Sequence, residues 1–137
     1  MDNLISNSEK LLFIGAIFHL CFVVFHLLFW KSFDWVQDLK NLSHTNKSVM
    51  QILNLRLVFV FLIFAYISYY NASEMLQTKL GLTLLIAISL FWGFRIVEQV
   101  IYFGLKKVAS NILLLIFFLG SALYLWIFYL GMKSNSF

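Results

Sequence analysis

The stretch LLFIGAIFHLCFVVFHLLFW occupies residues 11–30, and its polar side chains are two histidines, His19 and His26. A helix needs about 20 apolar residues to cross the hydrocarbon core of a bilayer. Inside lipid every backbone N–H and C=O must be hydrogen-bonded within the structure, and barrel strands alternate in polarity along their length. A run this long and this continuously apolar therefore predicts a membrane-spanning α-helix.

Three further apolar runs of similar length follow, near residues 52–70, 80–103 and 108–130. The composition agrees, because the 137 residues are 62% hydrophobic and only 12% charged. An ordinary soluble domain is about 25% charged. We expect an all-α protein whose residues 1–137 form a single transmembrane domain, an integral membrane four-helix bundle. The short connections predict that the second, third and fourth spans pack as sequential antiparallel neighbours.

The longest connection follows the first span and contains a possible surface helix at residues 33–42. Apolar residues recur there at every third position, with charged residues between them: Phe33, Val36, Leu39 and Leu42. This pattern suits a short helix that lies on the membrane surface, with Trp35 at the headgroup level. A loop of mixed polarity fits the same residues equally well.

The charged residues favour a membrane role over nucleic-acid binding. The net charge is +4, but the Lys and Arg residues are scattered and form no basic stripe for a phosphate backbone. Near the first and third connections stand Lys31, Lys40, Lys47, Lys106 and Lys107, and on the opposite face Lys10, Lys79 and Lys133. Basic residues concentrate on the cytoplasmic side of membrane proteins, which predicts cytoplasmic first and third connections and both termini outside.

Several polar residues lie inside the predicted spans, where an ionisable side chain costs roughly 2.5–3.5 kcal/mol. They are His19 and His26 on the first span, Asn54 and Arg56 on the second, and Arg95, Glu98 and Gln99 on the third. A helix rises about 1.5 Å per residue. On this spacing His19 lies near the midplane, and all the others lie in one half of the bilayer.

The spacing also predicts which way these side chains face. His19 and His26 are seven residues apart, so they share one side of the first span. On the third span a stripe with steps of three or four holds Trp92, Arg95, Gln99 and Tyr102, with Glu98 beside it. Turning both faces inward would form a polar pocket between the first three spans. The alternative is structural: the arginines reach the interface, Arg95 and Glu98 neutralise each other, and His19 joins neighbouring helices.

These residue types suit an amphipathic ligand. Arginines bind phosphate or carboxylate head groups, and aromatic residues offer flat apolar walls. The predicted ligand-binding residues are Arg56, Arg95, Asn54, Gln99, Trp30, Trp92 and Tyr102. The candidates for acid–base chemistry are His26 and His19, with Glu98 as partner. We expect a protein that binds a lipid-like small molecule. A small membrane enzyme acting on such a molecule, and a homo-oligomer or accessory subunit of a larger membrane complex, remain alternatives.

No cofactor or metal is expected. Two histidines that bind one haem iron must approach it from opposite sides, whereas His19 and His26 share one face of one helix. Histidine pairs that bind a metal from one helix are normally four residues apart, not seven.

The first span also shows a family-like pattern: His19, then His26 seven residues later, then Trp30 four residues later. It resembles the first span of a family of small, largely uncharacterised four-span bacterial membrane proteins, which carry His, Glu and Trp at these offsets. Asn54 falls where that family has an Asn in its second span, whereas His26 stands in place of the Glu. The resemblance implies a four-helix membrane fold, a location in the bacterial inner membrane, and no established activity.

Overall fold

The computed structural model describes residues 2–32 and 34–134, without the side chains of residues 2–4, 30 and 32. Its four long helices are α1 (Asp2–Leu27), α4 (His44–Tyr70), α6 (Lys79–Glu98) and α7 (Val108–Ser134). The short elements are α2 (Phe29–Ser32), α3 (Trp35–Asp38), the 3₁₀ turn η1 (Leu39–Asn41), α5 (Ala72–Gln77) and the π-helical turn η2 (Gln99–Phe103). Four segments are long and apolar enough to cross a membrane: Ile5–Leu27, His44–Tyr70, Lys79–Phe103 and Val108–Ser134. The predicted all-α, four-span membrane fold is confirmed.

Two of the long helices begin earlier than their apolar runs. Helix α1 starts at Asp2, well before the predicted boundary at residue 11, and α4 starts at His44 instead of residue 52. At the start of α4 the side chain of Ser43 accepts a hydrogen bond from the backbone N–H of Asn46, at 3.3 Å. This capping bond satisfies a backbone donor that has no partner within the helix. Local capping, rather than hydropathy, therefore sets where α4 begins.

The connection after α1 is helical, so the predicted short helix is correct and the loop alternative is wrong. It contains α3 and η1, which begin after Asp34 in a left-handed conformation (φ 45°). Aspartate tolerates this conformation better than most residues. Of the predicted apolar positions, Leu39 is buried whereas Val36 and Leu42 are exposed. Phe33 lies outside the described residues.

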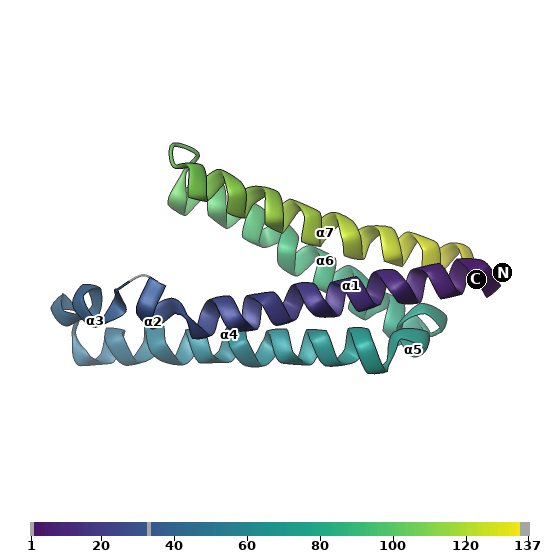
Figure 1. Ribbon diagram of the computed structural model, residues 1–137, viewed down its shortest axis with the longest axis horizontal. Helices are drawn as coiled ribbons and strands as arrows, with labels where there is room; N and C mark the ends of the chain where they lie inside the picture. Colours follow the sequence, from purple (N-terminus) through teal and green to yellow (C-terminus); the bar gives the residue numbers. More distant parts are fainter. Residues whose placement is uncertain (1, 33, 135–137) are drawn as a thin grey trace.

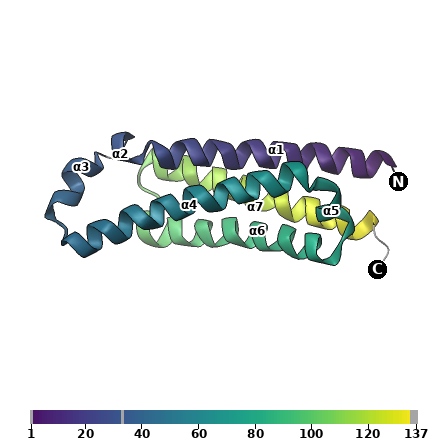
Figure 2. The same cartoon turned by 90° about the horizontal axis from the view of Figure 1, so that it is seen from below.

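The bundle consists of two antiparallel helix pairs, α1 with α4 and α6 with α7 (Figure 1). The pairs lie close together at the end that carries both termini and α5. They diverge toward the end that carries α3 and the connection between α6 and α7, which we call the open end. Figure 2, a view at right angles, shows α1 and α6 along the two long sides of the bundle, with α4 running obliquely between them and overlapping α7.

The predicted neighbour order is only partly right. Helices α6 and α7 do pack as an antiparallel pair, but α4 packs mainly on α1. Contact between α4 and α6 comes from aromatic rings, such as Phe61 on Trp92 with centroids 5.5 Å apart. Long aromatic side chains can bridge backbones that are too far apart to pack directly, which explains how the pairs stay joined while diverging.

Helix α5 holds the pairs together at the terminal end. Its residues Met75 and Leu76 are each 1% exposed. Gly81 of α6 lies against the α5 backbone, where an added Cβ would come within 2.3 Å of the Glu74 carbonyl oxygen. Only glycine permits so close an approach of two backbones. The connection between the pairs is thus a packed joint.

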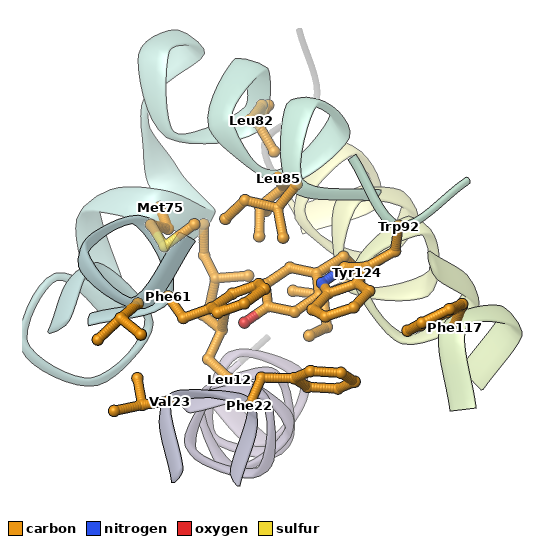
Figure 3. Packing of buried hydrophobic residues seen from close by; sticks show 14 residues of the cluster. Leu12, Phe22, Val23, Phe61, Met75, Leu82, Leu85, Trp92, Phe117 and Tyr124 are labelled. Carbon is orange, nitrogen blue, oxygen red and sulfur yellow. The ribbon is translucent and has the colours of Figure 1, made fainter. Parts of the chain in front are cut away.

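The core lies where the two pairs meet and is rich in aromatic residues. Figure 3 shows Phe22, Phe61, Trp92 and Phe117 directed toward the middle of the bundle from four different helices. The Phe61 and Trp92 rings are stacked at 10°, and the Phe22 and Trp92 centroids are 4.5 Å apart. Such ring pairs contribute about 0.5–1.5 kcal/mol each beyond burial. This aromatic layer separates the tight end of the bundle from the open end.

Candidate functional site

A closed set of polar side chains, which we call the core cluster, lies within the bundle: His19, Ser68, Trp92 and Tyr124. Each comes from a different long helix, and His19 is 0% exposed. The indole Nε1–H of Trp92 donates to His19 Nε2 at 3.1 Å. The hydroxyl of Tyr124 lies 3.2 Å from His19 Nδ1 and 2.7 Å from Ser68 Oγ. Figure 3 shows Trp92 and Tyr124 meeting at the centre of the bundle.

The partners of His19 determine its tautomer. An indole N–H can only donate, so Nε2 of His19 must be the acceptor and Nδ1 carries the hydrogen. Nδ1–H then donates toward the hydroxyl of Tyr124, whose own hydrogen is left to donate to Ser68. Both ring nitrogens are used inside the bundle. This geometry favours the structural alternative for His19, in which the side chain joins helices.

A second set of polar side chains lies at the open end, and its first half joins α1 to α4. Nδ1 of His26 and Oδ1 of Asn54 are 2.7 Å apart, and the Asn54 amide donates to the His26 carbonyl oxygen at 2.9 Å. That carbonyl is available because α1 ends at Leu27, and the last carbonyls of a helix have no partner within it. The Asn54 oxygen can only accept, so Nδ1 of His26 carries the hydrogen.

The second half of this set is an ion pair on α6. Nη1 of Arg95 donates to Oε2 of Glu98, and the two side chains are 33% and 46% exposed. The guanidinium carbon of Arg95 lies 5.1 Å from the ring centroid of Phe117 on α7, a cation–π contact. We call His26, Asn54, Arg95 and Glu98 the open-end cluster.

The remaining predicted residues do not join the open-end cluster. Gln99 is 2% exposed and donates to Ser110 Oγ at 2.8 Å, while Ser110 donates to the Gly104 carbonyl. These bonds tie the π-helical turn to the start of α7, across a connection in which Gly104 adopts φ 64°. Gln99 therefore belongs to a local joint between two helices.

Two other predicted ligand-binding residues face away from the bundle. Arg56 is exposed on α4, and Tyr102 is 79% exposed on η2. Trp92 belongs to the core cluster. Trp30 falls in α2, and its side chain lies outside the described residues. The structure thus places four of the predicted site residues at the open end, as a His26–Asn54 pair between α1 and α4 and an Arg95–Glu98 pair on α6, and separates the others.

Two apolar grooves lie on either side of α1, and they differ from the predicted polar pocket. The α1–α7 groove has a volume of 840 Å³ and runs from Phe25 and Leu113, near the open end, to Ile14 and Leu123. On α7 this stretch is about 15 Å long at the helical rise. The α1–α4 groove has a volume of 600 Å³ and includes Tyr66 among its lining residues.

The α1–α7 groove was absent from the sequence prediction, which rests on polar residues, whereas the groove is lined by apolar ones. Its floor depends on small residues of α7, notably Gly120, where an added Cβ would come within 2.7 Å of the Phe18 ring. Ala122 also lines the groove. Small residues facing aromatic ones across two spans are the signal that could have revealed it.

Comparison with known proteins finds no match to this chain among family models, curated proteins or solved structures. The resemblance of the first span to four-span bacterial proteins therefore remains a prediction. The protein is a small integral membrane protein of four spans, and its function has to be inferred from its own residues.

Proposed function

We propose that this protein binds an amphipathic, lipid-like small molecule. The apolar part of the ligand occupies the α1–α7 groove, and its polar head meets the open-end cluster. The observation that carries this proposal is a partly exposed Arg95–Glu98 pair at the same end of the bundle as the start of an apolar groove.

The groove has the size and character of a ligand site. Its volume of 840 Å³ falls within the range of about 300–1,000 Å³ that is usual for small-molecule sites, which are mostly apolar with a few polar groups. One aromatic ring separates it from Arg95. Phe117 carries the Arg95 guanidinium on its face, and its centroid lies 6.0 Å from that of the groove residue Phe22.

The partly exposed charges of Arg95 and Glu98 support a ligand-binding role for the open-end cluster. Ionisable side chains within membrane spans are costly and usually face a cavity, a partner or a pathway. Arg95 and Glu98 lie in the last turn of α6, at the open end, and both side chains keep about a third to a half of their surface open. A purely structural pair would be expected to complete its shell of partners within the bundle, as the core cluster does.

The distribution of lysines supports an orientation for this site. Five lysines lie in or beside the connections at the open end, and three lie near the opposite face. We infer that the open end lies at the cytoplasmic leaflet, with both termini outside.

Native mass spectrometry of the gently solubilised protein tests the binding function. We expect a co-purifying lipid-like molecule in stoichiometric amount, lost in Arg95→Leu. The matched control is Arg56→Leu, which removes an exposed arginine of α4 that lies away from the groove; it should retain the molecule. A ligand-free protein that appears only as an oligomer or with a partner would refute the binding site and make these polar residues an assembly surface.

The single cysteine offers a second measurement, because Cys21 is exposed and lines the α1–α7 groove. A groove filled by ligand shields this thiol, so a membrane-permeant maleimide should label the wild type more slowly than Arg95→Leu. Unfolded protein gives the rate without shielding. Equal labelling rates in the two folded proteins contradict a ligand in this groove.

A further inference from the structure

We propose that the head group is a zwitterion with a primary ammonium, as in phosphatidylethanolamine, its phosphate on Arg95 and its ammonium on Glu98. This inference rests on the proposed function and specifies the ligand class of the same site.

The first step is the charge of the site. Arg95 and Glu98 are three residues apart, on adjacent turns of one helix face, where side chains stand about 5–6 Å apart at Cβ. The site therefore presents one positive and one negative group side by side. Complementary potentials favour a head group that also carries both signs and has no net charge.

The second step is hydrogen-bonding capacity. The ion pair uses Nη1 of Arg95 and Oε2 of Glu98. A guanidinium has five N–H donors and a carboxylate has two oxygens with several acceptor positions. The pair can therefore donate to a phosphate and accept from an ammonium while it stays intact, and the partial exposure of both side chains leaves these positions accessible.

The third step distinguishes a primary ammonium from a quaternary one. The carboxylate of Glu98 offers acceptor oxygens at the head position. A primary ammonium has three N–H donors for such acceptors, whereas a quaternary ammonium has none. Phosphatidylethanolamine should thus bind better than phosphatidylcholine.

The fourth step concerns anionic lipids. A head group with a net negative charge is attracted by Arg95 but repelled by the carboxylate of Glu98. Such repulsion between like charges disfavours the binding of an anionic lipid. Phosphatidylglycerol should therefore bind less well than phosphatidylethanolamine, and Glu98 is the residue that imposes this preference.

The test supplies delipidated, folded protein with an equimolar mixture of phosphatidylethanolamine, phosphatidylglycerol and phosphatidylcholine of identical acyl chains, and compares their adducts by native mass spectrometry. In the wild type we expect phosphatidylethanolamine adducts to exceed each of the others about fivefold, which is the scale of one partly exposed ion pair. Glu98→Gln should reverse the preference toward phosphatidylglycerol, and Arg95→Gln should weaken all three adducts.

A double variant, Arg95→Glu with Glu98→Arg, separates selectivity from folding. It keeps the ion pair and the net charge, so it should retain the preference for phosphatidylethanolamine. Wild-type adducts in which phosphatidylglycerol or phosphatidylcholine equals phosphatidylethanolamine overturn the inference, as does a Glu98→Gln variant with unchanged ratios. The wild type could instead prefer phosphatidylglycerol and lose that preference in Arg95→Gln. This result would contradict the inference of a zwitterionic head group but would still support lipid binding at this site. Equal, weak adducts in the wild type and in Arg95→Gln overturn both.

Discussion

The core cluster and the open-end cluster each contain a histidine of α1, seven residues apart on one face of the helix, yet their surroundings differ completely. His19 has both ring nitrogens bonded within the bundle and no exposed surface. His26 bonds to Asn54 through one nitrogen and stands at the end where an ion pair remains partly exposed. Two histidines on the same helix face therefore differ in role: His19 joins helices inside a closed core, whereas His26 lies where polar side chains remain partly exposed.

The difference comes from the divergence of the helix pairs. At the level of His19 all four long helices supply a side chain to the cluster, because the pairs are still close. At the level of His26 the hydrogen bonds stay within the α1–α4 pair, and the ion pair stays on α6. Depth along the bundle thus decides whether a polar side chain is enclosed.

The largest expected effect is the loss of the core cluster. His19→Ala leaves a cavity and removes the partner of Trp92 and one of the two partners of Tyr124, so we expect a loss of about 3 kcal/mol in the free energy of unfolding. His26→Ala should cost about 1 kcal/mol, because its cavity opens to the surroundings. Denaturant titration in mixed micelles measures both. Equal losses in the two variants would mean that the histidines have the same structural role, contrary to the comparison.

A smaller effect is expected from crowding the core cluster. A Cβ on Gly15 would lie 2.4 Å from the Tyr124 hydroxyl oxygen, so Gly15→Ala must displace that side chain from His19 and Ser68. We expect a loss of about 1–3 kcal/mol. Gly93→Ala is the matched control, because the nearest atom to its Cβ is Ser121 Oγ at 3.6 Å. The free energy of unfolding of Gly93→Ala should stay within about 0.5 kcal/mol of the wild-type value. If Gly93→Ala loses as much stability as Gly15→Ala, crowding of Tyr124 does not explain the effect.

The smallest effect concerns the bonds between His26 and Asn54. A double-mutant cycle with His26→Ala and Asn54→Ala should give a coupling energy of about 0.6 kcal/mol, the average for hydrogen bonds between membrane helices. The same cycle for His19 and Trp92 should give a larger value, because both groups are fully enclosed. A coupling at the open end that exceeds the one in the core would contradict the proposed difference between the clusters.

The sequence predicts the spans and the depth of the polar residues better than it predicts their facing. Run length and polarity suffice for four helices because a bilayer accepts few alternatives. Helical rise suffices to bring His26, Asn54, Arg95 and Glu98 to one end. Facing depends on which helices form pairs, and α4 packs on α1 in place of its expected neighbour. Arg56 consequently faces outward.

Local geometry accounts for other departures. The spacing predicts that Gln99 lies beside Arg95, but the helix changes to a π-helical turn at Gln99. The turn and the left-handed Gly104 bring Ser110 within reach of the Gln99 amide. A prediction based on regular α-helical spacing does not hold where the helix becomes π-helical, and for this reason the predicted facing of Gln99 is wrong.

The divergence of the two helix pairs also gives the molecule a wedge shape (Figure 1). A wedge occupies more area in one leaflet of the bilayer than in the other. Lateral compression of the leaflet at the open end acts to bring the pairs together, and stretching of that leaflet acts to separate them. Because α5 packs against all four long helices at the opposite end, any change in the spacing of the pairs alters the cross-section at the open end more than at the terminal end.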